Sequence, residues 1–382
     1  MKRIFRLITV LIALAVLPFP ARAAALTVAG KSAVLMDVAT GTVLYESNSH
    51  QRLAPASVTK VMTMLLIMEA VDAGKIAMTD TVTASEAAAA KGGSQVYLKA
   101  GETMPVSDML KSIAVSSAND CACAMAEHLA GSEEAFVAQM NQRAAELGMQ
   151  DTHFVNCTGL DDGENAAEHK TSAHDIALMS RQLLKDHPDI KKFTTIWMDT
   201  IRNGTFGLSN TNKLVRFYQG ATGLKTGFTS GAGYCLSATA QREGMELIAV
   251  VMGADTSASR NAACKQLLDY GFANFALIRP ELTDAQPVAV KLGKADSVSA
   301  VLGQSQGILI DKARKSSVAM ELSAESTVTA PVSQGQRLGT LTVKAGDQVL
   351  QEVPLVASEA VERMSFGDLL AMVLKRAAMA KI

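Results

Sequence analysis

The chain has 382 residues, of which 48% are apolar and 19% charged, so it can bury sizeable hydrophobic cores in roughly 2 to 3 domains. Its 36 basic side chains almost cancel its 37 acidic ones. This balance excludes the broad positive surface that a nucleic-acid-binding protein needs, and we expect no nucleic-acid partner.

The N-terminus has the features of a secretory signal. Three basic residues precede an apolar run and a small-x-small site: Lys2, Arg3, Arg6, Leu7–Leu17 and Ala21-Arg22-Ala23. The pattern predicts an exported protein with a cleaved signal peptide over residues 1–23. The apolar run is too short for a spanning helix, although a retained N-terminal anchor is the alternative.

The five cysteines leave at least one thiol unpaired in an exported chain. Cys121 and Cys123 are two residues apart on a predicted helix, so they point in different directions and lack the usual spacing of metal ligands. We interpret all five as small buried hydrophobic residues and predict no metal site. H-E-x-x-H and Walker A motifs are also missing from the sequence, and we predict no cofactor.

The first large unit, residues 24–280, combines strands at both ends with helices between them. Strands are predicted at Ser32–Met36, Thr42–Tyr45, Ala221–Thr226, Gly233–Ala240 and Glu246–Gly253, and helices at Val58–Ala73, within Val106–Leu147, after Ser172 and at Ser259–Phe275. The helix from Val58 is apolar almost all round, so it should be buried. This order of elements predicts an α+β fold with an antiparallel sheet.

A smaller unit follows at residues 283–356. Short runs rich in Val and Leu alternate there with Gly, Ser and Asp, and no helical period is present. This pattern predicts a small all-β domain.

The last segment, residues 358–382, returns to a helical pattern. One face would carry Phe366, Leu369, Leu370, Val373 and Ala377, and the other Ser365, Asp368, Lys375 and Arg376. Charges interrupt the segment too often for a transmembrane span. An amphipathic helix in the membrane interface and a helix docked on protein fit the pattern equally well.

Ser57-Val58-Thr59-Lys60 is the strongest chemical signal. Ser57 should lie at the start of the buried helix, where the positive end of the helix dipole favours an incipient alkoxide. Lys60 shares its face, and burial would lower the pKa of that lysine until the neutral amine could take the proton of Ser57. The alternative is a capping serine with a lysine whose ammonium reaches water.

Two further motifs follow. Ser117-Ala118-Asn119 lies in a predicted break between helices, where the hydroxyl could relay a proton and the amide could hold the substrate or Lys60; alternatively it caps the next helix. Lys225-Thr226-Gly227 lies at the end of a predicted strand, where a cation and a hydroxyl can hold a carboxylate while Gly227 leaves room for substrate. Its alternative is a strand end with an exposed lysine.

Together the three motifs resemble the triple signature of penicillin-binding proteins and serine β-lactamases. The likeness narrows to the low-molecular-mass D-alanyl-D-alanine carboxypeptidases on four further grounds. These are Ala54–Thr63, His153-Phe154 with Gly159-Leu160-Asp161, Tyr270-Gly271-Phe272, and the order of signal, catalytic domain, β domain and terminal helix.

The resemblance implies a role for each motif residue. Ser57 would be the acylated nucleophile and Lys60 its base, with Ser117 and Asn119 assisting proton transfer and positioning. Lys225, Thr226, Gly227, Phe228 and Arg260 would bind substrate, with the backbone N–H groups of Ser57 and Phe228 as the oxyanion hole. The sequence departs from the family pattern at Ala118, where glycine is common, and at Phe228, where some members have histidine.

By the same resemblance the enzyme would remove the terminal D-alanine from peptidoglycan stem peptides and would be acylated by β-lactams. It would act at the outer face of the cytoplasmic membrane as a peripheral protein held by its C-terminal helix. The alternatives with the same site are a transpeptidase or endopeptidase and a β-lactamase, although a β-lactamase normally lacks the β domain. A catalytically silent cell-wall-binding scaffold is the alternative from another class, and the presence of Ser57 and Lys60 argues against it.

Overall fold

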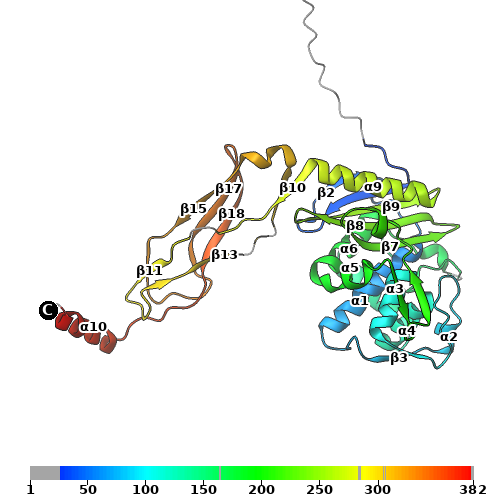
Figure 1. The fold of residues 1–382 in the computed structure, drawn as a ribbon, viewed down its shortest axis with the longest axis horizontal. Coiled ribbons are helices and arrows are strands. Elements are labelled where there is room, and N and C mark those ends of the chain that lie inside the picture. The colour runs from blue at the N-terminus through cyan, green and yellow to red at the C-terminus, as the bar shows by residue number, and fades with distance from the viewer. Residues whose placement is uncertain (1–25, 163–164, 283–284, 304, 306, 380–382) are drawn as a thin grey trace, which may run out of the picture.

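The structure is a computed structural model that describes residues 26–162, 165–282, 285–303, 305 and 307–379. The predicted signal peptide, residues 1–23, lies outside the described residues. Figure 1 shows a large α+β domain joined to an elongated β domain, with a final helix at the end farthest from the large domain. The predicted fold class is confirmed.

The large domain is built on an antiparallel sheet of five strands in the order β2-β1-β9-β8-β7. The strands are β1 (Ser32–Asp37), β2 (Val43–Ser47), β7 (Ala221–Thr229), β8 (Gly233–Arg242) and β9 (Met245–Ala254). All ten residues of the central strand β9 are buried because both faces of the sheet are covered. Strand β7 forms an edge of the sheet, and its outer side borders the candidate site.

Helices cover both faces of this sheet. One face packs against α9, while the other packs against a group of helices that includes the buried helix α1 (Figure 1). The helices are α1 (Lys60–Asp72), α3 (Val106–Ser116), α4 (Asn119–Ala130), α5 (Glu133–Glu146), α6 (Ala173–Asp186) and α9 (Ser257–Asn274). Nine of the 13 residues of α1 are buried, so the prediction from its apolar surface is confirmed.

Shorter elements connect these helices and strands. They are β3 (Thr81–Thr83), α2 (Glu86–Ala89), β4 (Thr103–Pro105), α7 (Lys191–Thr194), β5 (Met198–Ile201), β6 (Phe206–Ser209), α8 (Leu214–Phe217), β10 (Phe275–Ile278), and the 3-10 helices η1 (Ala56–Thr59), η2 (Ala166–Glu168) and η3 (Pro188–Ile190). The prediction did not include β3, β4, β5 or β6, because such short runs carry little periodicity.

The β domain surrounds a small apolar core. Its elements are β11 (Val288–Lys291), β12 (Ser297–Val298), β13 (Ala300–Leu302), β14 (Ile308–Asp311), η4 (Lys312–Ser317), β15 (Val318–Ala324), β16 (Thr327–Thr329), β17 (Arg337–Ala345) and β18 (Gln348–Ala357). Strands β12, β11 and β16 form one sheet, and β13, β18, β17 and β15 form another. Buried side chains such as Val288, Val328 and Leu338 fill the space inside.

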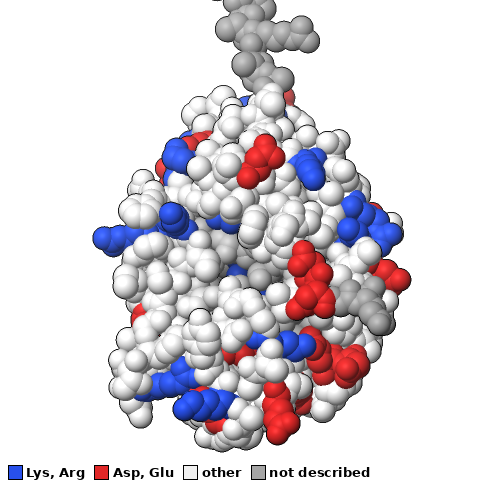
Figure 2. Space-filling model, turned by 90° about the vertical axis from the view of Figure 1, so that its right-hand side faces the viewer, with Lys and Arg blue, Asp and Glu red and all other residues white. Residues whose placement is uncertain are grey.

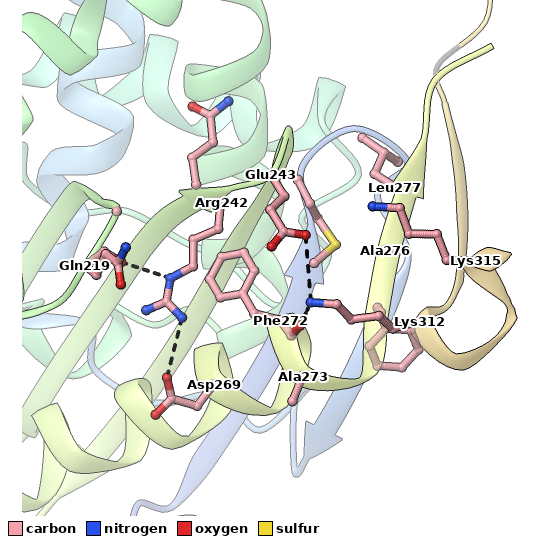
Figure 3. A pocket seen from close by; sticks show the side chains of 14 residues that line it. Gln219, Arg242, Glu243, Asp269, Phe272, Ala273, Ala276, Leu277, Lys312 and Lys315 are labelled. Atoms are coloured by element: carbon pink, nitrogen blue, oxygen red, sulfur yellow. Dashed lines mark hydrogen bonds and ion pairs between the residues drawn. The ribbon is translucent and has the colours of Figure 1, made fainter.

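The two domains meet through a shared pair of strands. Strand β10, which follows α9, pairs antiparallel with β14 of the β domain. A pocket of about 590 Å³ lies beside this junction, and Figure 3 shows the side chains that line it. Lys312 of η4 donates there to the Phe272 carbonyl oxygen at 3.0 Å. The ring of Phe272 also packs against the guanidinium of Arg242, at 4.7 Å. The junction is therefore a packed contact that involves both domains.

The C-terminal helix α10 (Phe366–Met379) begins eight residues later than the predicted start at Ser358. The intervening residues belong to the β domain: Val361 is 4% exposed, lies in its core and pairs with Val332. The predicted apolar face begins only at Phe366, so residues 358–365 carried no helical signal of their own. No helix among the described residues is long and apolar enough to cross a bilayer.

Candidate active site

Ser57 lies in the one-turn helix η1, directly before α1, and its side chain is half-buried. The preceding residue, Ala56, has a φ of 49°, which side chains rarely adopt. The Thr59 hydroxyl donates to the Ala56 carbonyl oxygen at 2.9 Å and braces this turn. The hydroxyl of Ser57 is therefore held at the positive end of α1, as the sequence predicted.

Two glycines allow other segments to pack closely against this turn. A Cβ atom on Gly227 would lie 3.0 Å from the backbone nitrogen of Ser57, and one on Gly159 would lie 1.9 Å from the Ala56 carbonyl oxygen. The expectation that Gly227 mainly leaves room for substrate is therefore incomplete. Because Gly227 has no side chain, strand β7 can approach the backbone of Ala56–Thr59, which we call the nucleophile turn.

Lys60 is fully buried, and three acceptors surround its Nζ atom. They are Ser57 Oγ at 3.0 Å, Asn119 Oδ1 at 2.5 Å and the Thr158 carbonyl oxygen at 2.8 Å. Burial lowers the pKa of Lys60 to about 7, although Cys157 and Asp120 raise it by smaller amounts. Near neutrality the amine can therefore donate to Asn119 and Thr158 and accept the proton of Ser57. The alternative of a solvent-reaching lysine is wrong.

Asn119 is the first residue of α4, and the segment before α3 fixes its orientation. Its Nδ2 donates to the Gly92 carbonyl oxygen at 2.7 Å. Its backbone nitrogen donates to the Ser94 carbonyl oxygen, also at 2.7 Å. Ser117 ends α3 with a left-handed φ of 64°, and within the described residues its hydroxyl makes no hydrogen bond. That hydroxyl is therefore free to bond a substrate atom, whereas the amide of Asn119 is already bonded to Lys60.

Lys225 and Thr226 lie inside β7, which continues to Thr229, so the motif is not at a strand end as predicted. Lys225 is 1% exposed, which also rules out the alternative of an exposed lysine. Its Nζ donates to the carbonyl oxygen of Thr226 at 2.9 Å. The Thr226 hydroxyl bonds that of Thr211 at 2.6 Å.

Arg260 lies within α9 and adds a third buried cation. Burial is the main cause that lowers the pKa of Lys225 well below its ordinary value, and the charges of Lys60 and Arg260 add to it. Arg260 bonds only neutral partners, among them Asn261 and Ser257, and no ion pair involves any of the three cations in the described part of the chain. Such a site is suited to an anionic ligand, because an added negative charge offsets the mutual repulsion.

Phe228 follows the third motif and is 54% exposed. Its ring stacks on that of Tyr234, with centroids 4.3 Å apart, and the Arg260 guanidinium lies 5.8 Å from the Tyr234 centroid. The end of the β7–β8 hairpin therefore presents an aromatic surface next to the buried cations. Figure 2 shows that the face turned away from the β domain is hollowed near its middle, with basic atoms at the floor of the hollow.

The sequence did not reveal His169, which supports the nucleophile turn from 110 residues away. The backbone nitrogen of Val155 donates to Nδ1 of His169 at 3.1 Å, so the ring proton is on Nε2 and is donated to Thr59 Oγ1 at 2.7 Å. Burial lowers the pKa of His169 to about 4, which keeps the ring neutral. The chain of bonds continues from Thr59 to the carbonyl oxygen of Ala56.

All five cysteines are buried, as predicted. Cys157 and Cys123 both contact the carboxylate of Glu133, at 3.2 and 3.8 Å. Within the described residues, no group of three or more His, Cys, Asp and Glu side chains is arranged to hold a metal ion.

A serine hydroxyl beside a buried lysine, next to further buried cations, is characteristic of serine-type acyl-transfer enzymes that act on carboxylate-bearing substrates. Comparison with known proteins narrows this class. Residues 20–256 match the family model described as D-alanyl-D-alanine carboxypeptidase, and residues 283–363 match the C-terminal domain of penicillin-binding protein 5.

Known relatives agree with these matches. The chain is 46% identical over 343 residues to D-alanyl-D-alanine carboxypeptidase DacF of Bacillus subtilis, covering 88% of this chain and 87% of the relative. Penicillin-binding protein 5 of Haemophilus influenzae is 31% identical, with a TM-score of 0.70 over 88% of this chain and 98% of that one. The ampicillin-bound penicillin-binding protein D2 of Listeria monocytogenes is 33% identical, with a TM-score of 0.59 over 65% of this chain and 99% of that one.

The chain therefore belongs to the serine D-alanyl-D-alanine carboxypeptidases, a family of low-molecular-mass penicillin-binding proteins. The family expected from the three motifs is confirmed.

Proposed function

We propose that this chain removes the terminal D-alanine from peptidoglycan stem peptides through an acyl-enzyme on Ser57. The observation that carries the proposal is the 3.0 Å contact between Ser57 Oγ and the fully buried Nζ of Lys60. An amine with a pKa of about 7 can take up the serine proton at neutral pH. The family membership supports the reaction, and this contact supports Ser57 as its nucleophile and Lys60 as its base.

Substrate binding begins with the terminal carboxylate. Lys225, Thr226 and Arg260 would receive this group, because the buried cations lack acidic partners in the described structure. The aromatic surface of Phe228 would border the same end of the substrate. Binding a carboxylate there favours the charged form of Lys225, whose pKa is otherwise lowered by burial.

Acyl transfer then needs four proton transfers, each to or from Lys60. Ser57 passes its proton to Lys60 as its oxygen attacks the penultimate carbonyl, whose oxygen would be held by the N–H groups of Ser57 and Phe228. When the C–N bond breaks, the leaving amine of D-alanine takes a proton from Lys60, with Ser117 as a relay. Water then attacks the ester carbonyl and gives a proton to Lys60, which returns it to the Ser57 oxygen as the acyl C–O bond breaks, while Asn119 keeps this lysine in place.

The test is release of free D-alanine from a synthetic peptide that ends in D-alanyl-D-alanine. The unaltered protein should release it, and intact-protein mass spectrometry after exposure to penicillin should show one covalent adduct that maps to Ser57. Ser57→Ala should remove both results and leave the fold intact by circular dichroism. Activity retained in Ser57→Ala, or an adduct on another residue, contradicts the assignment. D-alanine leaves during acylation in either case, so the shortened peptide as the second product identifies a carboxypeptidase, whereas a cross-linked product formed with an added amine acceptor identifies a transpeptidase.

We also propose that the protein is exported and lies on the outer face of the cytoplasmic membrane through α10. Four side chains of this helix are large, apolar and at least half-exposed: Phe366, Leu370, Val373 and Leu374. The helix has the amphipathic pattern of interfacial helices, and it lies at the end farthest from the large domain (Figure 1). The active site would then face away from the lipid.

Truncation after Ser365 tests this location better than truncation after Ser358, because it keeps Val361 in the core of the β domain. The shortened protein should no longer sediment with anionic lipid vesicles, yet should release D-alanine from a short peptide at the normal rate. Continued sedimentation would show that another element binds the membrane.

A further inference from the structure

A pocket with aromatic side chains lies beside the candidate site, between the segment before α3 and the β5–β6 hairpin. It has a volume of about 650 Å³, and Tyr97 and Phe206 are its aromatic residues. The two rings meet edge to face, with centroids 6.5 Å apart. We call it the Tyr97 pocket. The mechanism proposed above does not use it.

The structure holds Tyr97 rigidly in an unusual position. Its side chain is 70% exposed and its φ is 58°, a left-handed conformation that is costly for an aromatic residue. The backbone nitrogens of Val96 and Leu98 both donate to the buried carboxylate of Asp120, at 3.1 and 3.0 Å. Arg202 donates to the Val96 carbonyl oxygen at 2.8 Å. The backbone that presents the ring to solvent is therefore fixed and needs no ordering when a ligand binds.

Two segments line the pocket, the one that carries Tyr97 and the one that carries Phe206, and each leads along the chain to the candidate site. On one side, the segment that carries Tyr97 bonds Asn119 through the carbonyl oxygens of Gly92 and Ser94. On the other side, β6 leads to Thr211, whose hydroxyl bonds that of Thr226. The segments that carry Tyr97 and Phe206 therefore each lead to a residue of the candidate site, Asn119 on one side and Thr226 on the other.

We infer that the Tyr97 pocket binds a sugar ring of the glycan strand that carries the stem peptide. This inference rests on the proposed function. A pyranose presents an apolar face of C–H groups that stacks on an exposed aromatic ring, while its hydroxyls reach polar groups at the rim, such as Lys99 and Glu102.

A peptide is a poorer occupant. An extended peptide binds by adding main-chain hydrogen bonds to a free backbone edge. Around Tyr97 that edge is already occupied, because Asp120 and Arg202 bond the backbone groups of Val96 and Leu98. The exposed ring of Tyr97, not its backbone, is therefore available to a ligand, and an exposed aromatic ring suits a sugar better than an extended peptide.

The test compares two substrates, two variants of Tyr97 and one control variant. The substrates are a short peptide without sugar and a soluble disaccharide carrying the same stem peptide. Tyr97→Asn removes the ring but suits a left-handed backbone, and Tyr97→Phe keeps the ring. Tyr97→Asn should lower kcat/KM for the sugar-bearing substrate roughly five- to tenfold through KM, and should leave the short peptide within about twofold. Tyr97→Phe and the control Met320→Asn, an exposed apolar site on β15, should behave as the unaltered protein.

A binding measurement separates the sugar from the peptide. Ser57→Ala protein should sediment with glycan strands stripped of their stem peptides, and adding Tyr97→Asn should abolish this. Equal losses on both substrates would show that Tyr97 only supports Asn119, and unchanged glycan binding or competition by free stem peptide would overturn the proposal. Failure of the unaltered protein to release D-alanine from the short peptide would instead refute the proposed function.

Discussion

The two domains differ in what they bury. Every buried polar or charged side chain in the described residues lies between Ser32 and Arg260, in the large domain. The core of the β domain, around Leu338, is wholly apolar. Burying Lys60 and Lys225 without carboxylate partners opposes folding, because each loses its hydration. The catalytic side chains of the large domain therefore lower its free energy of unfolding, whereas the core of the β domain contains, among its described residues, no buried polar group with such a cost.

The largest expected effect comes from removing the buried amine. Lys60→Met keeps the length and apolar stem but takes away the base, so acylation by penicillin and release of D-alanine should each fall roughly 10³-fold or more. Lys75→Met, at the exposed end of the same segment, is the matched control and should change neither rate. If Lys60→Met keeps a substantial rate, another group activates Ser57.

The pH dependence follows from the same amine. Because burial lowers the pKa of Lys60 to about 7, the acylation rate should be constant above this pH and fall about tenfold per unit below it. The unfolded chain keeps this proton up to a pH of about 10.4. The contribution of Lys60 to the free energy of unfolding should therefore rise with pH between these values and be lost in Lys60→Met. Stopped-flow acylation and urea unfolding at several pH values measure the two effects.

The sequence predicted the parts of the site that carry local signals. Ser57 and Lys60 are one helical turn apart, so their contact was predictable from their spacing. The burial of the lysine was predictable because an apolar helix follows them. The five-stranded sheet was also predictable, because its strands are long and bounded by turns. The roles of Gly159 and His169 were not predictable, because each acts on Ala56 or Thr59 from about 100 residues away. Gly159 belongs to a run that resembles the family, but that run does not indicate the contact with Ala56, and His169 has no motif.

A moderate effect is expected from the chain of bonds between His169 and the nucleophile turn. Thr59→Val removes the hydroxyl that joins His169 to the Ala56 carbonyl oxygen, and should lower the acylation rate about tenfold with little change in KM. Thr59→Ser keeps the hydroxyl and should retain the rate. His169→Leu should resemble Thr59→Val, and the double variant should lose no more than either alone. Additive losses would mean that the two residues act separately.

The smallest effect on catalysis is expected in the β domain, where a core change should alter stability alone. Leu338→Ala leaves a cavity at a fully buried position of β17 and should cost about 3 kcal/mol of the free energy of unfolding of that domain. Val349→Ala, at a site on β18 that is 49% exposed, should cost much less. Release of D-alanine from a short peptide should stay the same in both, because no residue of the proposed mechanism lies beyond Arg260. A loss of activity in Leu338→Ala while the large domain stays folded would show that the β10–β14 junction transmits changes between the domains, and the contrast between them would then apply to packing but not to function.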